Sequence, residues 1–189
     1  MAIKVAINGF GRIGRCTLRA IYEQGLQNEF DVVAINAAGD LKTNAHLLKY
    51  DTTHGRFRTP VETDGENCII IDGKRIAFYS TKNPKEINWA DHGVDILLEC
   101  TGAYTTKAKA SALLEQGAKR VLISAPGGDD VDTTIVYGVN EELLRADMTV
   151  VSNASCTTNC LAPVAKILSD NIGIKQGLMT TIHAYTNDQ

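Results

Sequence analysis

The sequence lacks several features that would each assign it to a broad class of protein. It has no uninterrupted apolar run of about 18 residues, the length that a membrane-spanning helix needs. It has no basic excess, since 19 scattered Lys and Arg stand against 22 Asp and Glu, which argues against nucleic acid as a partner. We expect no signal peptide, because Lys4 leads straight into a strand pattern. We therefore expect a cytoplasmic protein with neither a membrane nor a nucleic acid as partner.

A disulfide framework is also missing, because the 5 cysteines are odd in number and irregularly spaced. In a reducing compartment such residues are mostly small core side chains, or one of them is a reactive thiol. We expect Cys160 in the core and place three others on predicted buried faces. Those three are Cys16, Cys68 and Cys100.

What is present is an alternation of short apolar runs and helical patterns, which is typical of a parallel sheet with crossover helices. The pair Asp72-Gly73 lies between two strand-like runs and predicts a hairpin. We predict an α/β fold with a Rossmann-type doubly wound parallel sheet. The expected strands are 3–7, 32–36, 95–100, 120–124, 133–137 and 149–152, and the expected helices are 12–24, 43–50 and 105–115.

A second region begins near residue 155. A helical pattern covers 155–173 and contains Pro163, which we expect to kink the helix. The last segment, "GLMTTIHAYTNDQ", predicts a strand and stops without a cap or a polar tail. We expect a dinucleotide-binding domain at 1–154 and, at 155–189, the start of an α+β catalytic domain in a truncated chain.

The stretch "NGFGRIG" has the spacing G-x-G-x-x-G, with glycines at Gly9, Gly11 and Gly14. The first glycine permits a tight turn, the second lets the backbone approach a pyrophosphate, and the third lets the helix pack against the strand. The amides of Arg12 and Ile13 would then face the phosphates at the helix N-terminus. A plain strand–helix turn would not need all three glycines, so we predict a dinucleotide site.

The stretch "SNASCTTNC" puts Cys156 at the start of a helix, where a thiolate is stabilised, and His183 could assist it. Such a thiolate attacks an aldehyde to give a thiohemiacetal, which loses hydride to a nicotinamide and becomes a thioester. A cysteine–histidine pair also fits a thiol hydrolase, but the upstream glycine turn favours redox chemistry. A metal held by Cys156, Cys160 and His183 would lack a fourth ligand, so we predict none.

Four stretches resemble glyceraldehyde-3-phosphate dehydrogenase: "INGFGRIGR", "HLLKYDTTHGRF", "SNASCTTNCLAPVAK" and "TTIHAYTNDQ". The resemblance covers the chain essentially end to end, and the cysteine block is its most specific part. It implies phosphorylating oxidation of glyceraldehyde 3-phosphate to 1,3-bisphosphoglycerate, with inorganic phosphate as co-substrate, in a glycolytic homotetramer. Erythrose-4-phosphate dehydrogenase shares this chemistry, but its histidine segment typically departs from H-A-Y-T-N-D. In truncated form, a non-catalytic nucleotide-binding module is a further interpretation.

The resemblance also implies roles for individual residues. Cys156 is the nucleophile, and His183 activates the thiol and handles the proton. The substrate contacts are Ser155, Thr157 and Thr186, and the dinucleotide contacts are Asn8, Gly9, Gly11, Arg12, Ile13, Gly14, Thr101 and Ser124.

An expected acid is missing after the second strand, in "VVAINAAGDL". NAD-using members of the family carry Asp where this chain has Ala37. An Asp binds the ribose 2′-hydroxyl and repels a 2′-phosphate, so its loss removes the repulsion and opens space. Lys82 replaces a family arginine near the adenine and could pair with the phosphate. We therefore expect NADP, or both NADP and NAD, as cofactor. The alternative is that Asp40 replaces the lost acid and NAD stays preferred.

Overall fold

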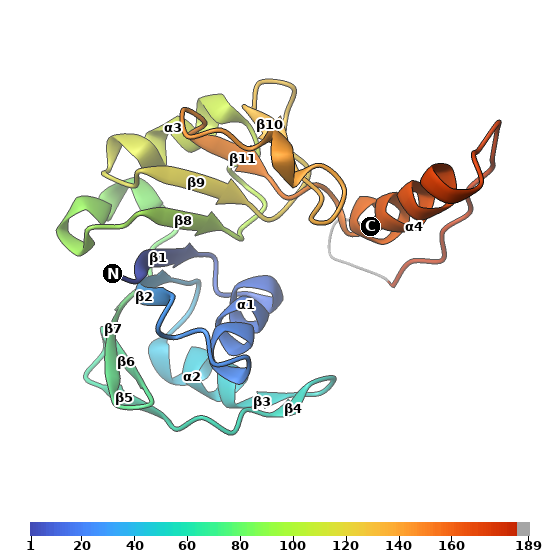
Figure 1. Ribbon diagram of the computed structural model, residues 1–189. Helices are drawn as coiled ribbons and strands as arrows, with labels where there is room; N and C mark the ends of the chain where they lie inside the picture. The colour runs from blue at the N-terminus through green and yellow to red at the C-terminus, as the bar shows by residue number, and fades with distance from the viewer. Residues whose placement is uncertain (185–189) are drawn as a thin grey trace.

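A twisted sheet forms the centre of the computed structural model, which describes residues 1–184 (Figure 1). Its strand order is β10-β11-β9-β8-β1-β2-β7-β6-β5, and neighbours are parallel from β10 to β7 and antiparallel from β7 to β5. The strands are β1 (Ile3–Asn8), β2 (Phe30–Asn36), β5 (Val61–Asp64), β6 (Cys68–Ile71), β7 (Lys74–Tyr79), β8 (Ile96–Glu99), β9 (Arg120–Ile123), β10 (Thr133–Thr134) and β11 (Val150–Ser152).

Helices cover both faces of this sheet, and a separate hydrophobic cluster lies under each set. The covering helices are α1 (Arg12–Glu23), α2 (Leu41–Lys49) and α3 (Lys107–Glu115), and a fourth helix, α4 (Cys156–Asn171), lies apart from the sheet (Figure 1). Short 3₁₀ turns occupy η1 (Pro84–Glu86), η2 (Trp89–His92) and η3 (Glu141–Leu143), and β3 (Tyr50–Asp51) pairs with β4 (Gly55–Arg56) apart from the main sheet.

The alternation of side chains along β1 assigns the helices to the two faces. Ile7 packs in the cluster that contains the apolar residues of α1 and α2, whereas Ala6 packs in the cluster that contains Ala110 and Leu113 of α3. Successive residues of a strand point to opposite faces, so α1 and α2 cover one face and α3 the other. The predicted Rossmann-type doubly wound sheet is confirmed.

The sheet changes direction of growth at β1, and this point positions the glycine turn. From β1 the chain adds β2 and then β7 on one side, and it returns through β8 to the other side of β1. Ligands of open parallel sheets bind outside the carboxyl ends of strands at such a switch point. The residues that follow β1 and β8 therefore lie where a dinucleotide would be expected.

Several element boundaries differ from the sequence-based expectation. Helix α2 begins at Leu41 rather than residue 43, because the Asp40 side chain caps it by accepting the Thr43 N–H at 2.8 Å. The expected strand 133–137 is reduced to β10. The predicted hairpin is confirmed, with positive φ at Asp72 (52°) and Gly73 (76°), as the mirror-image two-residue turn requires.

The region after the sheet differs most from expectation. Helix α4 runs through Pro163 without interruption, and its side chains are half-buried or exposed. The strand expected at 177–189 is wrong as far as residue 184, because residues 177–184 form no regular element. A strand needs a neighbour for its backbone N–H and C=O groups, and the described residues supply none there. Cys160, expected in the core, is exposed.

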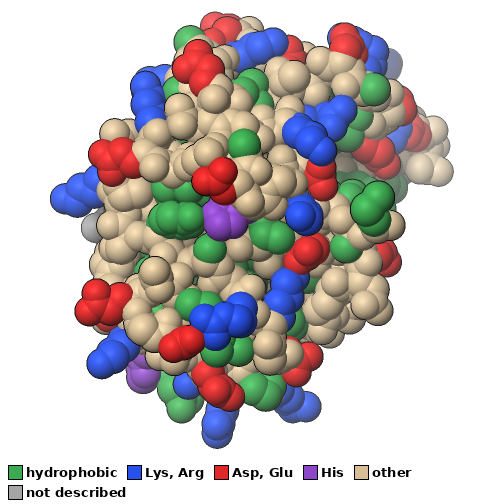
Figure 2. All heavy atoms as spheres, turned by 90° about the vertical axis from the view of Figure 1, so that its left-hand side faces the viewer, with side chains coloured by type: hydrophobic (Ala, Val, Ile, Leu, Met, Phe, Trp, Pro, Cys, Tyr) green, Lys and Arg blue, Asp and Glu red, His purple; other side chains and the backbone are tan. Residues whose placement is uncertain are grey.

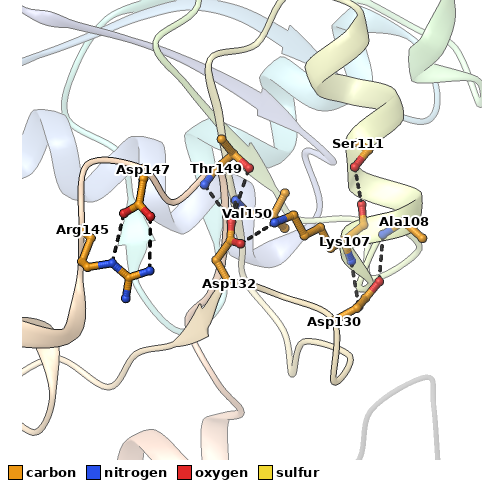
Figure 3. Close-up of polar contacts among 9 residues, drawn as sticks. All are labelled: Lys107, Ala108, Ser111, Asp130, Asp132, Arg145, Asp147, Thr149 and Val150. Carbon is orange, nitrogen blue, oxygen red and sulfur yellow. Dashed lines mark hydrogen bonds and ion pairs between the residues drawn. The ribbon is translucent and has the colours of Figure 1, made fainter.

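A polar network ties the loop before β10 to α3 and β11 (Figure 3). The Asp132 carboxylate accepts from the backbone N–H groups of Thr149 at 2.8 Å and Val150 at 2.9 Å, and it pairs with Lys107. Asp130 accepts from the N–H of Lys107 at 3.0 Å and of Ala108 at 2.9 Å. These bonds satisfy amides at the start of α3 and hold β11, the strand that leads to α4.

Acidic and basic side chains are interspersed on the face in Figure 2. Within residues 1–184, no helix is long and apolar enough to cross a membrane. In the same range, no three His, Cys, Asp or Glu side chains gather in a way that could hold a metal ion.

Candidate active site

The three glycines of the turn after β1 have different surroundings. Gly9 has φ of 98°, and a Cβ there would lie 2.7 Å from the backbone of Cys100 and Thr101. A Cβ at Gly14 would lie 2.2 Å from the carbonyl oxygen of Gly9. A Cβ at Gly11 would meet nothing within 4 Å. The turn is therefore closely packed at its first and third glycines and open at its second, the position where a pyrophosphate would approach.

The start of α1 offers backbone N–H groups without a side-chain cap. Gly11 is the N-cap residue and has no side chain to accept the first amides of the helix. The Arg12 guanidinium is turned away to Asp51, with N–O distances of 2.8 and 3.3 Å. Ile13 is 52% exposed. The sequence-predicted contacts Arg12 and Ile13 can thus present amides to an anion, in the positive field of the helix N-terminus.

The residue in place of the missing acid is enclosed rather than open. Ala37 is 2% exposed, packs in the cluster under α1 and α2, and donates its N–H to the carbonyl of Tyr79 at 3.0 Å. The space expected at Ala37 is therefore not found there. The exposed residues are Ala38 and Gly39, and a Cβ at Gly39 would meet only an Asn44 side-chain atom at 3.9 Å.

Asp40, the alternative acid, is held at the start of α2. Its carboxylate accepts from the N–H of Thr43 and, at 2.7 Å, from the Thr43 hydroxyl. These hydrogen bonds, the backbone one first, lower the pKa of Asp40. To bind a ribose hydroxyl, Asp40 would have to give up this cap.

Lys82 lies in the loop after β7, beside the segment that follows β2. The Ser80 hydroxyl donates to the carbonyl of Gly39 at 2.8 Å, and the Thr81 N–H donates to the Asn36 side chain at 3.2 Å. The Lys82 side chain is exposed. The loop that carries this lysine is thus bonded directly to the loop that lacks the acid.

Cys156 is the first residue of α4, and the turn before it is tightly defined. Ser155 is the N-cap, and its hydroxyl accepts from the N–H of Thr158 at 2.9 Å. Ala154 adopts the left-handed conformation, with φ of 58°, which is unusual for a residue with a Cβ. The Ser152 hydroxyl accepts the Ala154 N–H at 3.0 Å and helps to hold this conformation. The thiol is therefore presented at a helix N-terminus by a constrained turn.

His183 lies against the thiol although 27 residues separate the two in sequence. The distance from Cys156 Sγ to His183 Nε2 is 2.9 Å, and His183 Nδ1 lies 2.6 Å from the carbonyl oxygen of Ala184. A carbonyl only accepts, so Nδ1 carries a hydrogen and Nε2 faces the sulfur. Nε2 is thereby positioned to take the thiol proton.

The two groups shift each other's protonation. The hydrogen bond and charge of His183, with smaller contributions from Thr157, lower the pKa of Cys156. The same contact, assisted by the carbonyl of Ala184, raises the pKa of His183. By contrast, burial raises the pKa of the Cys100 thiol to about 11. The pair therefore favours a thiolate beside a protonated imidazole, whereas Cys100 stays a thiol.

Two cavities of about 390 Å³ each share Cys156. The second also contains Thr157 and His183. The first lies between the starts of α1 and α4, so residues from both sequence motifs line one space. Its lining includes Ile13, Cys100, Ser124, Ala154, Ser155 and Cys156.

Other sequence-predicted residues lie outside these cavities. Asn8 is fully buried, and its side-chain amide bonds to Asn36 and Glu99. Thr101 lies beside Gly9, and its backbone N–H donates to the Glu99 carboxylate at 2.8 Å. Thr186 lies outside the described residues.

Sequence reasoning missed several side chains that support the site. Glu99 and Asn36 are buried polar residues at strand ends beside the glycine turn, and Ser152 supports the turn into α4. The Asn159 amide donates to the carbonyls of Asn153 and Ser155 at 2.7 and 2.9 Å. The available signal was a polar residue ending an apolar strand, as in "LLEC" and "VAIN".

The doubly wound sheet and its glycine turn define a dinucleotide-binding protein of the Rossmann type. Residues 3–107 match the family model described as glyceraldehyde 3-phosphate dehydrogenase, NAD binding domain, and residues 155–189 match glyceraldehyde 3-phosphate dehydrogenase, C-terminal domain. The chain belongs to the glyceraldehyde-3-phosphate dehydrogenase family.

Curated relatives match over the whole chain. It is 58% identical to the plasmid-encoded glyceraldehyde-3-phosphate dehydrogenase of Cupriavidus necator, over 100% of this chain and 56% of the relative. It is also 58% identical to the Pseudomonas aeruginosa protein of that name, with the same coverage, and 59% identical to the Cereibacter sphaeroides one, over 100% of this chain and 55% of the relative. The chain thus spans about half the length of these relatives.

Proposed function

We propose that the full-length protein catalyses the phosphorylating oxidation of glyceraldehyde 3-phosphate to 1,3-bisphosphoglycerate with NAD(P). The observation that carries this proposal is the 2.9 Å contact between Cys156 Sγ and His183 Nε2, beside a cavity that extends to the start of α1. A thiol hydrolase would use the same pair but would need no dinucleotide turn. Family membership and the names of the relatives support the dehydrogenase.

The proposed chemistry starts from the thiolate that His183 favours. Cys156 Sγ attacks the aldehyde carbon, and the former carbonyl oxygen takes the proton that Nε2 of His183 received from the thiol, which completes a thiohemiacetal. Nε2 of His183 removes this proton as hydride leaves the same carbon, which becomes a thioester. Inorganic phosphate then attacks the thioester carbonyl, and the thiolate departs to leave an acyl phosphate. The bound nicotinamide supplies the hydride acceptor.

The residues of the turn fit a dinucleotide, because Gly9 and Gly14 are closed to a Cβ while Gly11 is open. We propose that residues 1–154 form the dinucleotide-binding domain and that 155–189 begin a catalytic domain. The proposed cofactor residues are Asn8, Gly9, Gly11, Arg12, Ile13, Gly14, Ala37, Lys82, Thr101 and Ser124. The proposed substrate residues are Ser155, Thr157 and Thr186. The homotetramer and the cytoplasmic location stay predictions.

Turnover of the full-length protein with glyceraldehyde 3-phosphate, NAD or NADP, and phosphate tests the reaction. We expect Cys156→Ser to abolish turnover and Cys160→Ser, an exposed thiol one helical turn away, to retain it. Omission of phosphate should stall the reaction at the thioester. Equal activity in the parent and Cys156→Ser would contradict the proposal. A higher kcat/KM for erythrose 4-phosphate would identify the protein as an erythrose-4-phosphate dehydrogenase instead.

The cofactor proposed is NADP, or both NADP and NAD. In support, no carboxylate stands at Ala37, Asp40 is bonded to Thr43, and the exposed Lys82 lies in a loop bonded to Gly39. These features remove the repulsion of a 2′-phosphate and provide a cation that can reach it.

Titration of NADP and NAD separately into the parent, Ala37→Asp and Asp40→Asn tests this preference. We expect NADP to bind the parent at least as tightly as NAD. Ala37→Asp should reverse the order, and its Tm shows whether the enclosed position accepts the carboxylate. Asn also caps helices well, so Asp40→Asn should leave the ratio unchanged. A parent that prefers NAD and loses this preference in Asp40→Asn would show that Asp40 replaces the acid.

A further inference from the structure

A chain of buried polar side chains crosses the carboxyl ends of three neighbouring strands. Asn36 ends β2, Asn8 ends β1 and Glu99 ends β8, and they are 4%, 0% and 0% exposed. Asn36 Nδ2 donates to Asn8 Oδ1 at 2.8 Å, and Asn8 Nδ2 donates to a Glu99 carboxylate oxygen at 2.5 Å. The proposed chemistry at Cys156 uses none of these side chains.

Each end of this series of side chains holds one part of the proposed cofactor site. At one end, the second oxygen of Glu99 accepts from the N–H and hydroxyl of Thr101, the residue packed against Gly9. At the other end, Asn36 binds both backbone polar groups of Thr81: the N–H donates to Asn36 Oδ1 and the C=O accepts from Asn36 Nδ2, each at 3.2 Å. The hydrogen-bonded side chains of Asn36, Asn8 and Glu99 thus connect the glycine turn to the loop of Lys82.

The carboxylate sets the direction of every bond in the chain. An ionised carboxylate accepts and cannot donate, so Asn8 must turn its NH₂ to Glu99 and its oxygen to Asn36. Asn36 must then turn its NH₂ to Asn8, and in this orientation its amide also matches the N–H and C=O of Thr81. A reversed amide at Asn36 would place donor against donor and acceptor against acceptor at Thr81.

Burying a carboxylate costs free energy, which argues that Glu99 does more than fill space between the strands. Burial raises the pKa of Glu99 against the opposing effect of its hydrogen bonds from Thr101 and Asn8. A glutamine has the same size and could still accept both bonds from Thr101. It could not accept from Asn8 with its remaining NH₂ group, so direction is what only the carboxylate supplies.

We propose that Glu99 is a positioning residue for the dinucleotide, whose carboxylate orients the Asn8–Asn36 amide chain and thereby holds the glycine turn and the Lys82 loop in one arrangement. This inference rests on the proposed cofactor site. It replaces the direct dinucleotide contact proposed above for Asn8 with a role beneath the cofactor, because both polar atoms of its side chain are engaged within the protein.

The test compares the full-length parent with Glu99→Gln, Asn8→Asp and the double variant. Glu99→Gln places two NH₂ groups face to face, so we expect the Kd for NADP to rise about tenfold, the effect of one unsatisfied buried donor. KM for the dinucleotide should rise with it while kcat changes little. In the double variant, the carboxylate at position 8 accepts from Asn36 and from the new amide, so affinity should return. Asn8→Asp alone opposes two carboxylates and should bind worst.

Amide exchange at Thr81 gives a readout that needs no cofactor. We expect it to accelerate in Glu99→Gln and to return to the parent rate in the double variant. Unchanged Kd and exchange in Glu99→Gln, or a double variant that stays impaired, would overturn the inference. Should Glu99→Gln not fold, the double variant decides alone. A Kd and an exchange rate equal to those of the parent support the inference, and impaired values overturn it. Should the parent bind no dinucleotide, the proposed function and the role of Glu99 toward the dinucleotide both fail, and the exchange at Thr81 decides only whether Glu99 holds the Lys82 loop.

Discussion

At the scale of residues, the contact of His183 with Cys156 distinguishes one thiol from the other four. Both side chains are exposed, so their interaction is not amplified by burial and depends on the short distance and on the helix N-terminus. Cys100 lines one of the same cavities, but burial moves its pKa the opposite way. Selectivity among thiols therefore follows from the partner and the surroundings rather than from access to the cavity.

The rate of alkylation by iodoacetamide should report this difference. We expect Cys156 to react first and its rate to rise with pH through an inflection below that of an ordinary cysteine, because His183 lowers its pKa. His183→Asn should move the inflection to higher pH and slow the reaction at neutral pH. Peptide mapping identifies the modified thiol. An unchanged profile in His183→Asn would show that the contact does not activate the sulfur.

Lys82 should affect only one of the two cofactors. Its ammonium group can pair with a 2′-phosphate but has no counterpart in NAD, so Lys82→Gln should weaken NADP several-fold and leave NAD unchanged. Lys85→Gln is the matched control, since Lys85 is another exposed lysine in the same segment, within η1. Isothermal titration measures both affinities. An equal loss of NADP affinity in the two variants would show that the effect comes from overall positive charge rather than from pairing with Lys82.

At the scale of elements, the strand–turn–helix unit of β1 and α1 divides its requirements between its glycines. Gly9 and Gly14 are required by packing within the protein, because a Cβ at either would collide with backbone. Gly11 has extended backbone, with φ of −71° and ψ of −158°, and open space around it, so nothing in the protein itself excludes a side chain. Its small size matters to a ligand instead.

Two alanine substitutions should separate these requirements. Gly14→Ala forces the turn and α1 apart and should cost about 1–3 kcal/mol, which lowers Tm by several degrees. Gly11→Ala should keep Tm and weaken the dinucleotide, because the added methyl group lies where the pyrophosphate approaches. Thermal unfolding and dinucleotide titration measure the two effects. A Gly11→Ala protein with normal affinity would place the pyrophosphate elsewhere.

At the scale of the whole molecule, Asp132 joins the loop before β10 to α3 and β11. Its bonds with Lys107, Val150 and Thr149, in that order of effect, hold its pKa well below the ordinary value. A carboxylate with a depressed folded pKa stabilises the protein above its unfolded pKa, and this contribution is lost as pH falls toward the folded pKa. Arg145–Asp147 in Figure 3 is a contrasting pair, exposed on both sides.

Asp132→Asn should therefore lower Tm at pH 7, and its difference from the parent should shrink as pH falls below about 4, where the unfolded carboxyl is protonated. Asp147→Asn, the matched control, should change Tm little at either pH, since exposed ion pairs contribute little. Thermal unfolding across pH measures both. A constant Tm difference for Asp132→Asn at all pH values would show that its charge is not what stabilises the fold.

The parts predictable from the sequence were those carried by local patterns. Alternation of apolar runs and helices indicated the parallel sheet, Asp72-Gly73 indicated the hairpin, and the small residues before Cys156 indicated a helix start. The strand expected at 177–189 was wrong as far as residue 184, because an apolar, β-branched run forms a strand only where another strand pairs with it.

The sequence by itself therefore determined the elements, the class of fold and the candidate groups, because backbone preference and side-chain periodicity act over a few residues. Only the tertiary structure showed that Asn8 meets Glu99 across 91 residues. The contact of Cys156 with His183 across 27 residues was expected from the family resemblance, and the tertiary structure supplied its geometry. Such contacts depend on strand order and on where loops return, and neither is encoded in local periodicity. The enclosure of Ala37 belongs to the same category, since it follows from neighbouring elements, whereas the capping by Asp40 is a local contact with Thr43, three residues along the chain.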